Sequence, residues 1–270
     1  MTKILALSGK KQSGKTTSMN FLFGSAMLSL DMVEYAHINE NGQLIVPGVD
    51  SKEDGIIPVI FPVDSMETNM VSYISENIWP SIKNYSFADM LKSMCIAILG
   101  LTTEQCYGTN EDKDTETHLR WEDMLEPRTW GRPGTPMTAR EVLQYVGTDI
   151  FRKMYPNVWV DCTLRRAVND TPQLALFTDC RFPNEVEGVQ NAGGKVIRFT
   201  RNPFEDNHYS ETALDEDKFD WGKFDWVLDN KNMTISEQNE AIYNKLVEWE
   251  FIDYKAIASY ATSETLLNKG

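Results

Sequence analysis

The sequence lacks the long apolar runs, the paired cysteines and the histidine clusters that mark several large classes of protein. No apolar run approaches the roughly 18 residues that a membrane-spanning helix requires, and the first residues predict a strand rather than a signal peptide. The four cysteines show no C-x-x-C spacing, and with only three histidines a structural zinc site is not expected. We therefore expect reduced thiols in a cytoplasmic protein that has no membrane segment.

Positive charge is also scarce, because 26 lysines and arginines stand against 40 acidic residues, for a formal net charge of −14. A general nucleic-acid-binding protein needs surplus cations to replace the counterions of the phosphate backbone, so we expect no such binding here. Internal repeats and low-complexity tracts are absent from the sequence as well. The 270 residues, 41% of them hydrophobic, suffice for one large globular domain with or without insertions.

What the chain does have is a complete phosphate-binding motif near its start. Residues 9–16 read GKKQSGKT, which matches G-x-x-x-x-G-K-[ST] and follows the apolar run 4–7. Apolar residues at helical spacing predict that the next segment is a helix with one buried face, made by Met19, Leu22, Phe23, Ala26, Met27 and Leu30. This order of strand, glycine-bearing turn and helix is typical of a P-loop that binds a nucleoside triphosphate.

Within the P-loop, each residue type suggests a role. The Lys15 ammonium is expected between the β- and γ-phosphates of ATP, and the Thr16 hydroxyl is expected to ligate Mg²⁺. The glycines allow several backbone N–H groups to converge on phosphate. We expect ATP to be bound by Gly9, Lys10, Lys11, Ser13, Gly14, Lys15, Thr16 and Thr17.

The rest of the chain alternates strands with helices, which predicts an α/β protein with a doubly wound, mostly parallel sheet and helices on both faces. Beginning at a P-loop, this order indicates the P-loop NTPase fold over residues 1–250, with 251–270 as a tail. Capping boxes mark two helix starts, at Thr138 and Thr234. Strands are predicted at 174–178, 195–200 and 226–229, and helices at 86–99, 138–153, 184–192 and 234 to about 251.

Two segments interrupt the alternation. In residues 31–85, Asn41-Gly42 lies between the apolar stretches 36–38 and 44–46, which is a strong signal for a hairpin. We expect this segment to be an inserted subdomain or lid. Residues 102–137 are polar and acidic, with glycine and proline towards the end, and predict a mobile loop or a second insertion over the site.

Phosphoryl transfer requires charge compensation around two polyanions, so arginines beyond the P-loop are candidates for phosphate binding. Arg128 and Arg132 lie in the Gly/Pro-rich loop, and Arg140 lies in the first turn of a capped helix. Lys92 lies off the apolar stripe of helix 86–99, and by itself indicates a surface lysine. Trp159 fits core packing or a platform on which a base stacks.

A second group of candidates follows the apolar strand 174–178. Asp179 lies at the carboxyl end of that strand, where ligands bind in open α/β sheets. Its carboxylate can hold a water on Mg²⁺ or accept a hydrogen bond from a sugar. Arg181 can reach a phosphate or pair with Asp179, and Glu185 lies on the next turn.

These motifs, in this order, resemble those of bacteriophage deoxynucleoside monophosphate kinases. The resemblance covers most of residues 1–250, whereas 31–85 and 251–270 look particular to this chain. It rests on the P-loop and on four further blocks: FADMLK at 87–92, TAREVLQYVGTD at 138–149, TDCRFPNE at 178–185 and HYSE at 208–211.

The resemblance implies a P-loop kinase that uses ATP to phosphorylate a deoxynucleoside monophosphate (dNMP). Residues 201–223 would then lie over the ATP, with Arg201 near its adenine. Arg132 is a further candidate for the substrate, although whether it or Arg128 matches the family arginine stays open. The monophosphate site would be lined by Lys92, Arg140, Gly147, Trp159, Asp179, Arg181 and Glu185.

The favoured mechanism is in-line transfer of the ATP γ-phosphoryl group to the dNMP. Lys15, Arg140 and Arg181 are the expected catalytic residues, and Thr16 and Asp179 are the expected contacts of Mg²⁺. Two alternatives remain: a P-loop kinase of another small metabolite, such as dephospho-coenzyme A or a nucleoside, and a nucleotide-gated binding protein. Kinases of this kind often pair, so a homodimer is one option for the assembly. The preferred base does not follow from the sequence.

Overall fold

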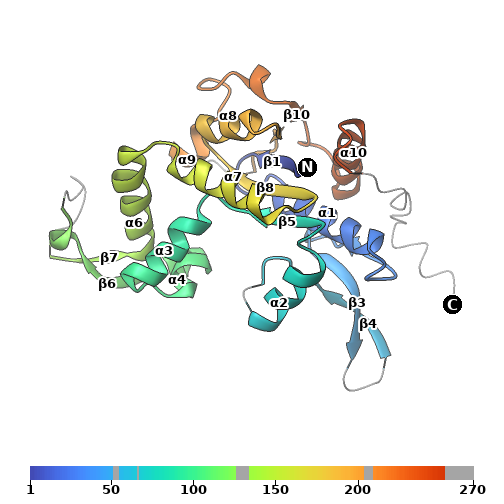
Figure 1. Cartoon of the computed structure of the whole chain (residues 1–270), viewed down its shortest axis with the longest axis horizontal. Helices are drawn as coiled ribbons and strands as arrows, with labels where there is room; N and C mark the ends of the chain where they lie inside the picture. The colour runs from blue at the N-terminus through green and yellow to red at the C-terminus, as the bar shows by residue number, and fades with distance from the viewer. Residues whose placement is uncertain (51–54, 66, 126–133, 204–208, 253–270) are drawn as a thin grey trace. The chain divides into compact units, whose positions relative to one another are not determined.

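The computed structural model describes residues 1–50, 55–65, 67–125, 134–203 and 209–252 (Figure 1). The chain divides into two compact units, one of residues Met1–Tyr85 and Arg166–Gly270 and the other of residues Ser86–Arg165. The sequence pattern gives no sign of this division.

The first unit is built on a five-stranded sheet of order β10-β9-β1-β8-β5, in which each paired set of described strands is parallel. Strands β1 and β8 are almost wholly buried, as their unbroken apolar runs predict. With helices packed against it, this sheet confirms the predicted mostly parallel α/β architecture. The strands are β1 (Lys3–Ser8), β5 (Ile82–Tyr85), β8 (Leu174–Cys180), β9 (Lys195–Phe199) and β10 (Trp226–Leu228).

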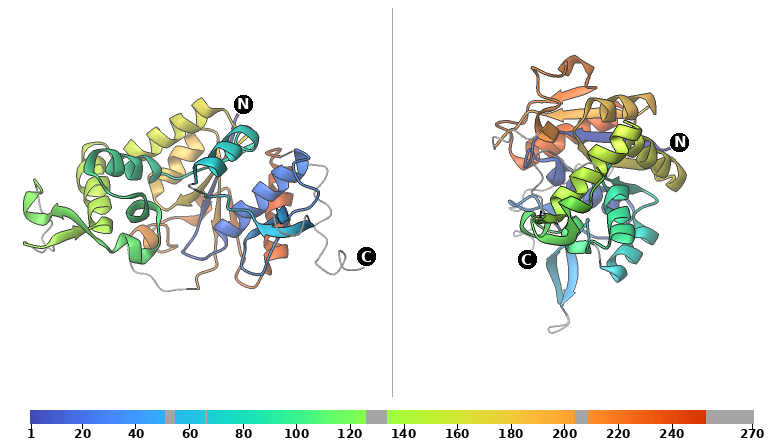
Figure 2. Two further views of the ribbon diagram at one scale, coloured as in Figure 1. Left: turned by 90° about the horizontal axis from the view of Figure 1, so that it is seen from below. Right: turned by 90° about the vertical axis from the view of Figure 1, so that its left-hand side faces the viewer.

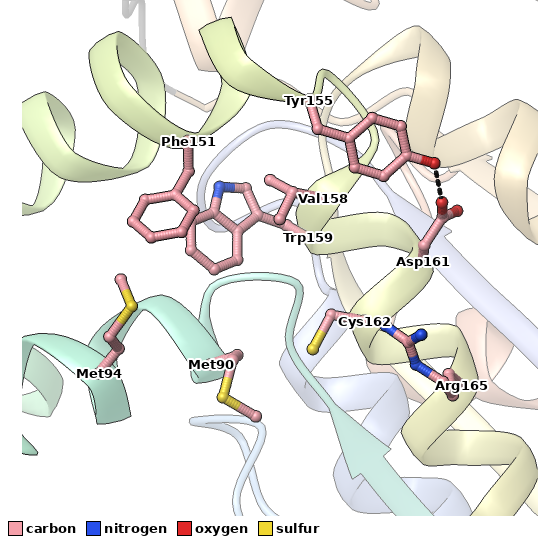
Figure 3. Close-up of a pocket in the computed structure, with 9 residues that line it drawn as sticks. All are labelled: Met90, Met94, Phe151, Tyr155, Val158, Trp159, Asp161, Cys162 and Arg165. Atoms are coloured by element: carbon pink, nitrogen blue, oxygen red, sulfur yellow. Dashed lines mark hydrogen bonds between the residues drawn. The ribbon is translucent and has the colours of Figure 1, made fainter.

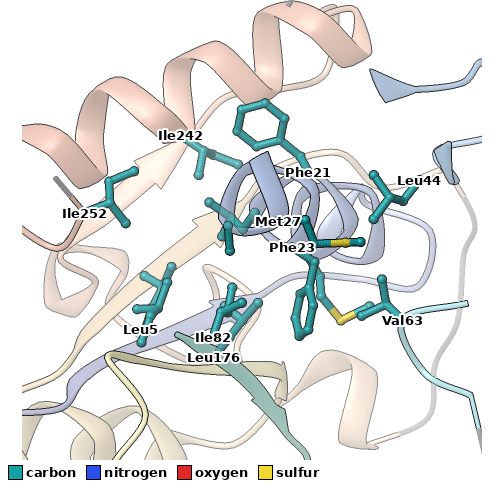
Figure 4. Packing of buried hydrophobic residues seen from close by; sticks show 14 of the residues in the cluster. Leu5, Phe21, Phe23, Met27, Leu44, Val63, Ile82, Leu176, Ile242 and Ile252 are labelled. Atoms are coloured by element: carbon teal, nitrogen blue, oxygen red, sulfur yellow. The ribbon is translucent and has the colours of Figure 1, made fainter. Parts of the chain in front are cut away.

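Helices α1 (Lys15–Ser29) and α10 (Ile235–Glu248) share one apolar core with the sheet. Figure 4 shows Met27 of α1 and Ile242 of α10 in the same cluster as Leu5 and Leu176. Helix α8 (Pro183–Asn191) packs against β1 and β9. The predicted helices after the P-loop, at 184–192 and after Thr234 are thus confirmed.

More of the circumference of helix α1 is buried than the sequence predicted. Phe21, Gly24 and Ser25 are buried in addition to the predicted apolar face, because α1 contacts α10, the hairpin strands and the central sheet at once. The placement of Leu30 on the buried face is wrong. The helix ends at Ser29, and Leu30 follows it as a cap that is 43% exposed.

The predicted hairpin is present and belongs to an antiparallel sheet of β2 (His37–Ile38), β3 (Leu44–Asp50) and β4 (Gly55–Ile60). Strands β3 and β4 stand out from the rest of the first unit (Figure 2). The turn has five residues, and the Asn39 side-chain oxygen accepts hydrogen bonds from the N–H groups of Asn41 and Gln43. Helix α2 (Thr68–Asn77) follows.

The insertion predicted over residues 31–85 is not independent of the core. Residues 82–85 form β5 of the central sheet, so assigning them to an insertion is wrong. Leu44, Val46, Phe61 and Val63 lie in the same apolar cluster as Leu5 of β1. A lid role for the remainder of the segment stays a prediction.

The second unit has its own apolar core, formed around Cys95, Trp121, Met137 and Val142. Its antiparallel pair β6–β7 lies in the segment 102–137, which was predicted as a mobile loop or a second insertion. The mobile loop is wrong for residues 102–125 and 134–137, which carry regular structure and a Trp121 that is 1% exposed, whereas an insertion over the site stays a prediction. Its elements are α3 (Asp89–Leu99), α4 (Thr103–Tyr107), α5 (Asn110–Lys113), β6 (Glu116–Arg120), η1 (Trp121–Asp123), β7 (Pro136–Thr138), α6 (Ala139–Gln144), η2 (Tyr145–Arg152) and the first half of α7 (Val158–Asp170).

The helix predicted over 138–153 is confirmed, but it changes type along its length. The capping box is formed, since Thr138 Oγ1 accepts from Glu141 N–H at 3.2 Å and Glu141 Oε2 accepts from Thr138 N–H at 2.7 Å. After α6 the chain continues as the π-helix η2, a conformation that no local sequence signal predicts. Such π-helical turns are frequent at functional sites.

Candidate active site

The P-loop joins β1 to α1 and is closed by a hydrogen bond from Ser13 N–H to Lys10 O at 3.2 Å. Gly14 precedes the helix with a φ of 104°, in the left-handed region. A Cβ at this position would lie 2.5 Å from Gln238 Oε1, so both the backbone conformation and the available space require glycine.

The Lys15 ammonium is folded back over the loop. Its Nζ donates to the carbonyl oxygens of Gly9 and Lys10, each at 2.7 Å, and lies 3.3 Å from Ser13 Oγ. Burial, and after it the nearby positive charge of Arg181, lower the pKa of Lys15 to about 8, against the raising effect of Glu211. The lysine is therefore already placed at the phosphate loop, where burial and a neighbouring arginine outweigh the effect of the nearby carboxylates on its pKa.

The two threonines after Lys15 point to different places. Thr16 is exposed at the start of α1, as a metal ligand should be. Thr17 Oγ1 faces the hairpin turn, since a Cβ on Gly42 would lie only 2.4 Å from it. Asn20 Nδ2 donates to Gly42 O at 2.8 Å and fixes the same turn against α1.

Asp179 and Arg181 lie beside the P-loop, because β8 pairs with β1 and places Cys180 opposite Ser8. Asp179 is close enough to Lys15 to raise its pKa. Arg181 forms an ion pair with Glu211, a partner that the sequence analysis did not consider. The structure thus brings Lys15, Asp179 and Arg181 together at one edge of the sheet.

Glu185 and Arg201 both make extensive contacts within the protein. The Glu185 carboxylate is buried and accepts from the N–H groups of Arg181 at 2.7 Å and Phe182 at 3.1 Å, capping α8. The Arg201 guanidinium donates to Asn230 O at 2.8 and 3.1 Å and to Met233 O at 2.6 Å. Contacts of either residue with a substrate or with adenine stay predictions.

Sequence reasoning missed a buried amide pair behind the P-loop. Asn230 Nδ2 donates to Ser13 O at 2.7 Å and to Gln238 Oε1 at 2.6 Å. Gln238 Nε2 donates to Gly14 O at 3.2 Å and to Ser18 Oγ at 2.9 Å. The spacing of Gln238 with Ile242 and Leu246, one buried face of α10, was an available signal.

A buried cation and its acidic neighbour were also missed. Arg198, on β9, is 4% exposed and donates from Nη1 to Ser8 Oγ at 3.1 Å. Its Nη2 lies 3.7 Å from Asp215 Oδ1, and Asp215 also binds Lys10 Nζ at 2.6 Å. Lys10, Lys15, Arg181 and Arg198 thus form a cluster of cations around the phosphate loop.

Four of the candidates for the acceptor, Lys92, Arg140, Gly147 and Trp159, lie in the second unit. Lys92 Nζ is 4.5 Å from the centre of the Tyr107 ring. Arg140 is partly exposed, and its Nε donates to Asp114 Oδ1 at 2.7 Å, with Nη2 3.3 Å from Asn110 Oδ1. The sequence analysis foresaw neither of these Arg140 partners. Arg128 and Arg132 lie outside the described residues.

Trp159 is a core residue and at the same time lines a pocket. Its Nε1 donates to Gly147 O, in η2, at 3.1 Å, and its ring lies 5.3 Å from that of Phe151. The pocket has a volume of about 430 Å³, within the range of small-ligand sites. Figure 3 shows its lining residues: Met90, Met94, Phe151, Tyr155, Val158, Trp159, Asp161, Cys162 and Arg165.

Three general observations complete the site. Among the described residues, no three His, Cys, Asp or Glu side chains gather as a metal cage. The four cysteines all lie in the described ranges and are free thiols. In the same ranges, no helix combines the length and apolar character needed to cross a membrane.

Comparison with known proteins agrees with the resemblance drawn from the motifs. A family model described as "Deoxynucleotide monophosphate kinase" matches residues 3–240, a range that includes residues of both compact units. A protein of Acanthamoeba polyphaga mimivirus, named "Putative deoxynucleotide monophosphate kinase", is 31% identical over 164 residues. The aligned part covers 56% of this chain and 77% of the viral protein.

Proposed function

The chain belongs to the deoxynucleotide monophosphate kinase family, and on that premise we propose that ATP is its phosphoryl donor, held by the P-loop of the first unit. The observation that carries this proposal is the arrangement of Lys15, whose ammonium is already held over the loop by Gly9 O and Lys10 O. A second observation supports it. The Glu211 carboxylate accepts from Lys11 N–H at 3.2 Å through Oε2 and pairs with Arg181 through Oε1, so these donors are oriented to bind oxyanions.

We assign Gly9, Lys10, Lys11, Ser13, Gly14, Lys15, Thr16 and Thr17 to the triphosphate, the last through the position of α1. A magnesium ion fits the residues at this edge of the sheet. An exposed hydroxyl at Thr16 and a carboxylate at Asp179, completed by phosphate oxygens and water, form the oxygen donor set that Mg²⁺ takes in kinases. When bound there, the ion would neutralise charge on the β- and γ-phosphates.

For the acceptor, we assign Arg140, Lys92 and Arg181 to the phosphate of the dNMP. Arg140 is suited to this because its ion pair with Asp114 is partly exposed, and such pairs contribute little and exchange easily. Trp159, Gly147 and the adjoining pocket are assigned to its nucleoside part, with Asp179 and Glu185 as further candidate contacts.

The step is an in-line displacement. An oxygen of the dNMP α-phosphate forms a new bond to the γ-phosphorus, and the bond from that phosphorus to the β,γ-bridging oxygen breaks, leaving ADP and a dNDP. The acceptor oxygen is already ionised at neutral pH, so no general base is required. Lys15 and Arg181 neutralise the charge that develops on the transferred group, and Arg140 neutralises the acceptor.

The test is a panel of the four common dNMPs, each assayed for ADP release from ATP with Mg²⁺. We expect at least one dNMP to stimulate ADP release far above the rate with water alone. No stimulation by any dNMP would contradict the choice of donor or acceptor. The family assignment argues against a kinase of hydroxyl acceptors, and a parallel panel with dephospho-coenzyme A and nucleosides checks that point.

The setting we propose is the cytoplasm, where dNMPs and ATP are available and where free thiols such as these four persist. A homodimer stays a prediction, which light scattering of the purified chain would check.

A further inference from the structure

Two carboxylates from one short segment, those of Glu211 and Asp215, contact donor groups of the phosphate loop and the cations beside it. The segment runs through α9 (Tyr209–Thr212) to Asp215, and it is anchored between the two carboxylates by Ala213 and Leu214, which are 5% and 1% exposed. Trp221 Nε1 donates to Leu214 O at 2.9 Å. Because Leu214 is fixed in the core, the positions of Glu211 and Asp215 are set by packing.

Glu211 occupies donors that a phosphate chain would use. Its Oε2 accepts from Lys11 N–H at 3.2 Å, and its Oε1 pairs with the Arg181 guanidinium. The side chain is only 8% exposed, although it is charged. A carboxylate is rarely buried to this extent unless it is paired, so these contacts hold it in place.

Asp215, four residues after Glu211, also contacts cations around the phosphate loop. Its two oxygens lie 2.6 and 2.8 Å from Lys10 Nζ, and Oδ1 lies 3.7 Å from Arg198 Nη2. Three cations therefore pair with the two carboxylates around the loop, and Lys15 lies within electrostatic range of Glu211. In the absence of phosphate, the carboxylates offset the mutual repulsion of Lys10, Lys15, Arg181 and Arg198.

A single N–H group cannot donate a good hydrogen bond to Glu211 and to a phosphate oxygen at once. We propose that Glu211 and Asp215 form an acidic latch, which holds the phosphate loop in the ligand-free enzyme and is displaced from Lys11 N–H, Arg181 and Lys10 when a triphosphate binds. The latch rests on the proposed function, in that it takes the P-loop as the site of ATP. Its two carboxylates act as internal competitors of the phosphate chain.

The test is the affinity for ATP rather than the rate of the reaction. Titration calorimetry of the full chain gives the Kd of ATP with Mg²⁺ for the wild type and for Glu211→Gln and Asp215→Asn. If the loop is open in roughly a tenth to a third of the molecules, removing a carboxylate should lower the Kd by roughly three- to tenfold. The Kd of inorganic tripolyphosphate, which has no nucleoside, should fall by the same factor, because the carboxylates compete only with the phosphates.

Glu216→Gln is the matched control. It removes one negative charge at an exposed position next to Asp215, and the described residues show no ion pair for it. It should leave the Kd within twofold of wild type. A gain equal to that of Glu211→Gln would indicate net charge as the cause and would contradict the latch. Thermal melts of each variant check that the fold is kept, and Asp215→Asn serves if Glu211→Gln does not fold.

The rival role for Glu211 is to position Arg181 during the reaction. In that case Glu211→Gln would lower kcat and leave the Kd of ATP unchanged or raised, and this result would overturn the latch. If the wild type and all latch variants bind neither ATP nor tripolyphosphate, the proposed donor site is itself wrong and the latch falls with it. Binding by wild type with no gain in either latch variant contradicts the latch alone.

Discussion

At the scale of single residues, Lys15 combines a catalytic position with an unusual proton affinity. Its pKa is lowered to about 8, first by burial and then by Arg181. In the unfolded chain the pKa is that of an ordinary lysine, so the folded state binds the proton less tightly. Burial of the ammonium therefore opposes folding below about pH 8, and this opposition is relieved as the pH rises from about 8 towards 10.5.

This proton affinity predicts a pH dependence of ATP binding. The phosphates add negative charge beside Lys15 and must raise its pKa above the value in the free protein. The affinity for ATP should therefore be constant below about pH 8 and should weaken above it, by up to about tenfold per pH unit. Calorimetry at about pH 8.5, in buffers of different ionisation enthalpy, should show proton uptake on binding.

Lys15→Arg is the control, since a guanidinium stays charged throughout this range. The variant should bind ATP without proton uptake, whatever its absolute affinity. Binding by wild type without proton uptake at about pH 8.5 would mean that the ammonium is already fully protonated in the free enzyme, against the lowered pKa.

Residues that act through a local motif were predictable, and those that act through distant partners were not. Lys15 and Asp179 follow from a P-loop pattern and from a strand end, and both lie where expected. Glu211 contacts a loop 200 positions earlier in the chain, and nothing in its own neighbourhood indicates that partner. The family resemblance implied a substrate contact for Glu185, but the buried capping bonds that it makes depend on where α8 begins.

At the scale of elements, the hairpin turn is tied to the start of α1 through Gly42. The φ of this residue is 76°, and a Cβ would lie 2.4 Å from Thr17 Oγ1. Gly42→Ala should therefore lower the free energy of unfolding by about 1 kcal/mol for the left-handed backbone and by about 1–3 kcal/mol more for the clash. Urea unfolding of the variant measures the sum.

Gly193→Ala separates the two contributions. Gly193 has a φ of 78°, but a Cβ there would meet no described atom within 4 Å, so only the backbone strain applies. The excess loss in Gly42→Ala should disappear when Thr17→Ala is added, because the clashing hydroxyl is then gone. Equal losses in Gly42→Ala and Gly193→Ala would show that the hairpin turn is not held against α1.

The amide pair behind the P-loop gives a second prediction at this scale. Asn230→Ala removes the donor to Ser13 O and Gln238 Oε1 and leaves both acceptors buried. We expect a loss of roughly 2–4 kcal/mol in the free energy of unfolding and a raised Kd of ATP, because the loop loses its support. Denaturant melts and calorimetry measure the two effects. The exposed Asn232→Ala should change neither, and a stable Asn230→Ala with normal ATP binding would contradict the assigned role.

Elements with strong local signals were predicted, and elements defined by their place in the sheet were not. The capping boxes at Thr138 and Thr234 and the apolar run of β8 located three elements correctly. Strand β5 was missed because Lys83 and Asn84 interrupt its apolar pattern at the edge of the sheet. The π-helix η2 contains Gly147, where a Cβ would lie 2.6 Å from Leu91 Cδ2, and a single sequence carries no signal for such close packing.

At the scale of the whole molecule, the candidate residues come from both compact units. The proposed donor residues Lys15 and Arg201 belong to the first unit, and so do the acceptor candidates Asp179, Arg181 and Glu185. The acceptor candidates Lys92, Arg140 and Trp159 belong to the second. The sequence predicted the chemical groups for both substrates but not this division. An alternation of strands and helices gives no indication of which segments share a core.

Arg140 lies in the second unit and the P-loop in the first, so we predict that a change at Arg140 alters binding of the dNMP and not of ATP. Arg140→Ala should lower kcat/KM for the dNMP by roughly tenfold to a hundredfold, the value of lost charge-assisted hydrogen bonds to a phosphate. The Kd of ATP, measured without dNMP, should stay within twofold of wild type.

Asp114→Asn is the control, because it removes the ion-pair partner of Arg140 and keeps the guanidinium, so it should leave kcat/KM nearly unchanged. If Arg140 served only that ion pair, both variants would lose the same small stability, and activity in both would follow the loss of fold. A Kd of ATP that rises as much as kcat/KM falls would instead show that Arg140 acts on the donor, and its assignment to the acceptor would then be wrong.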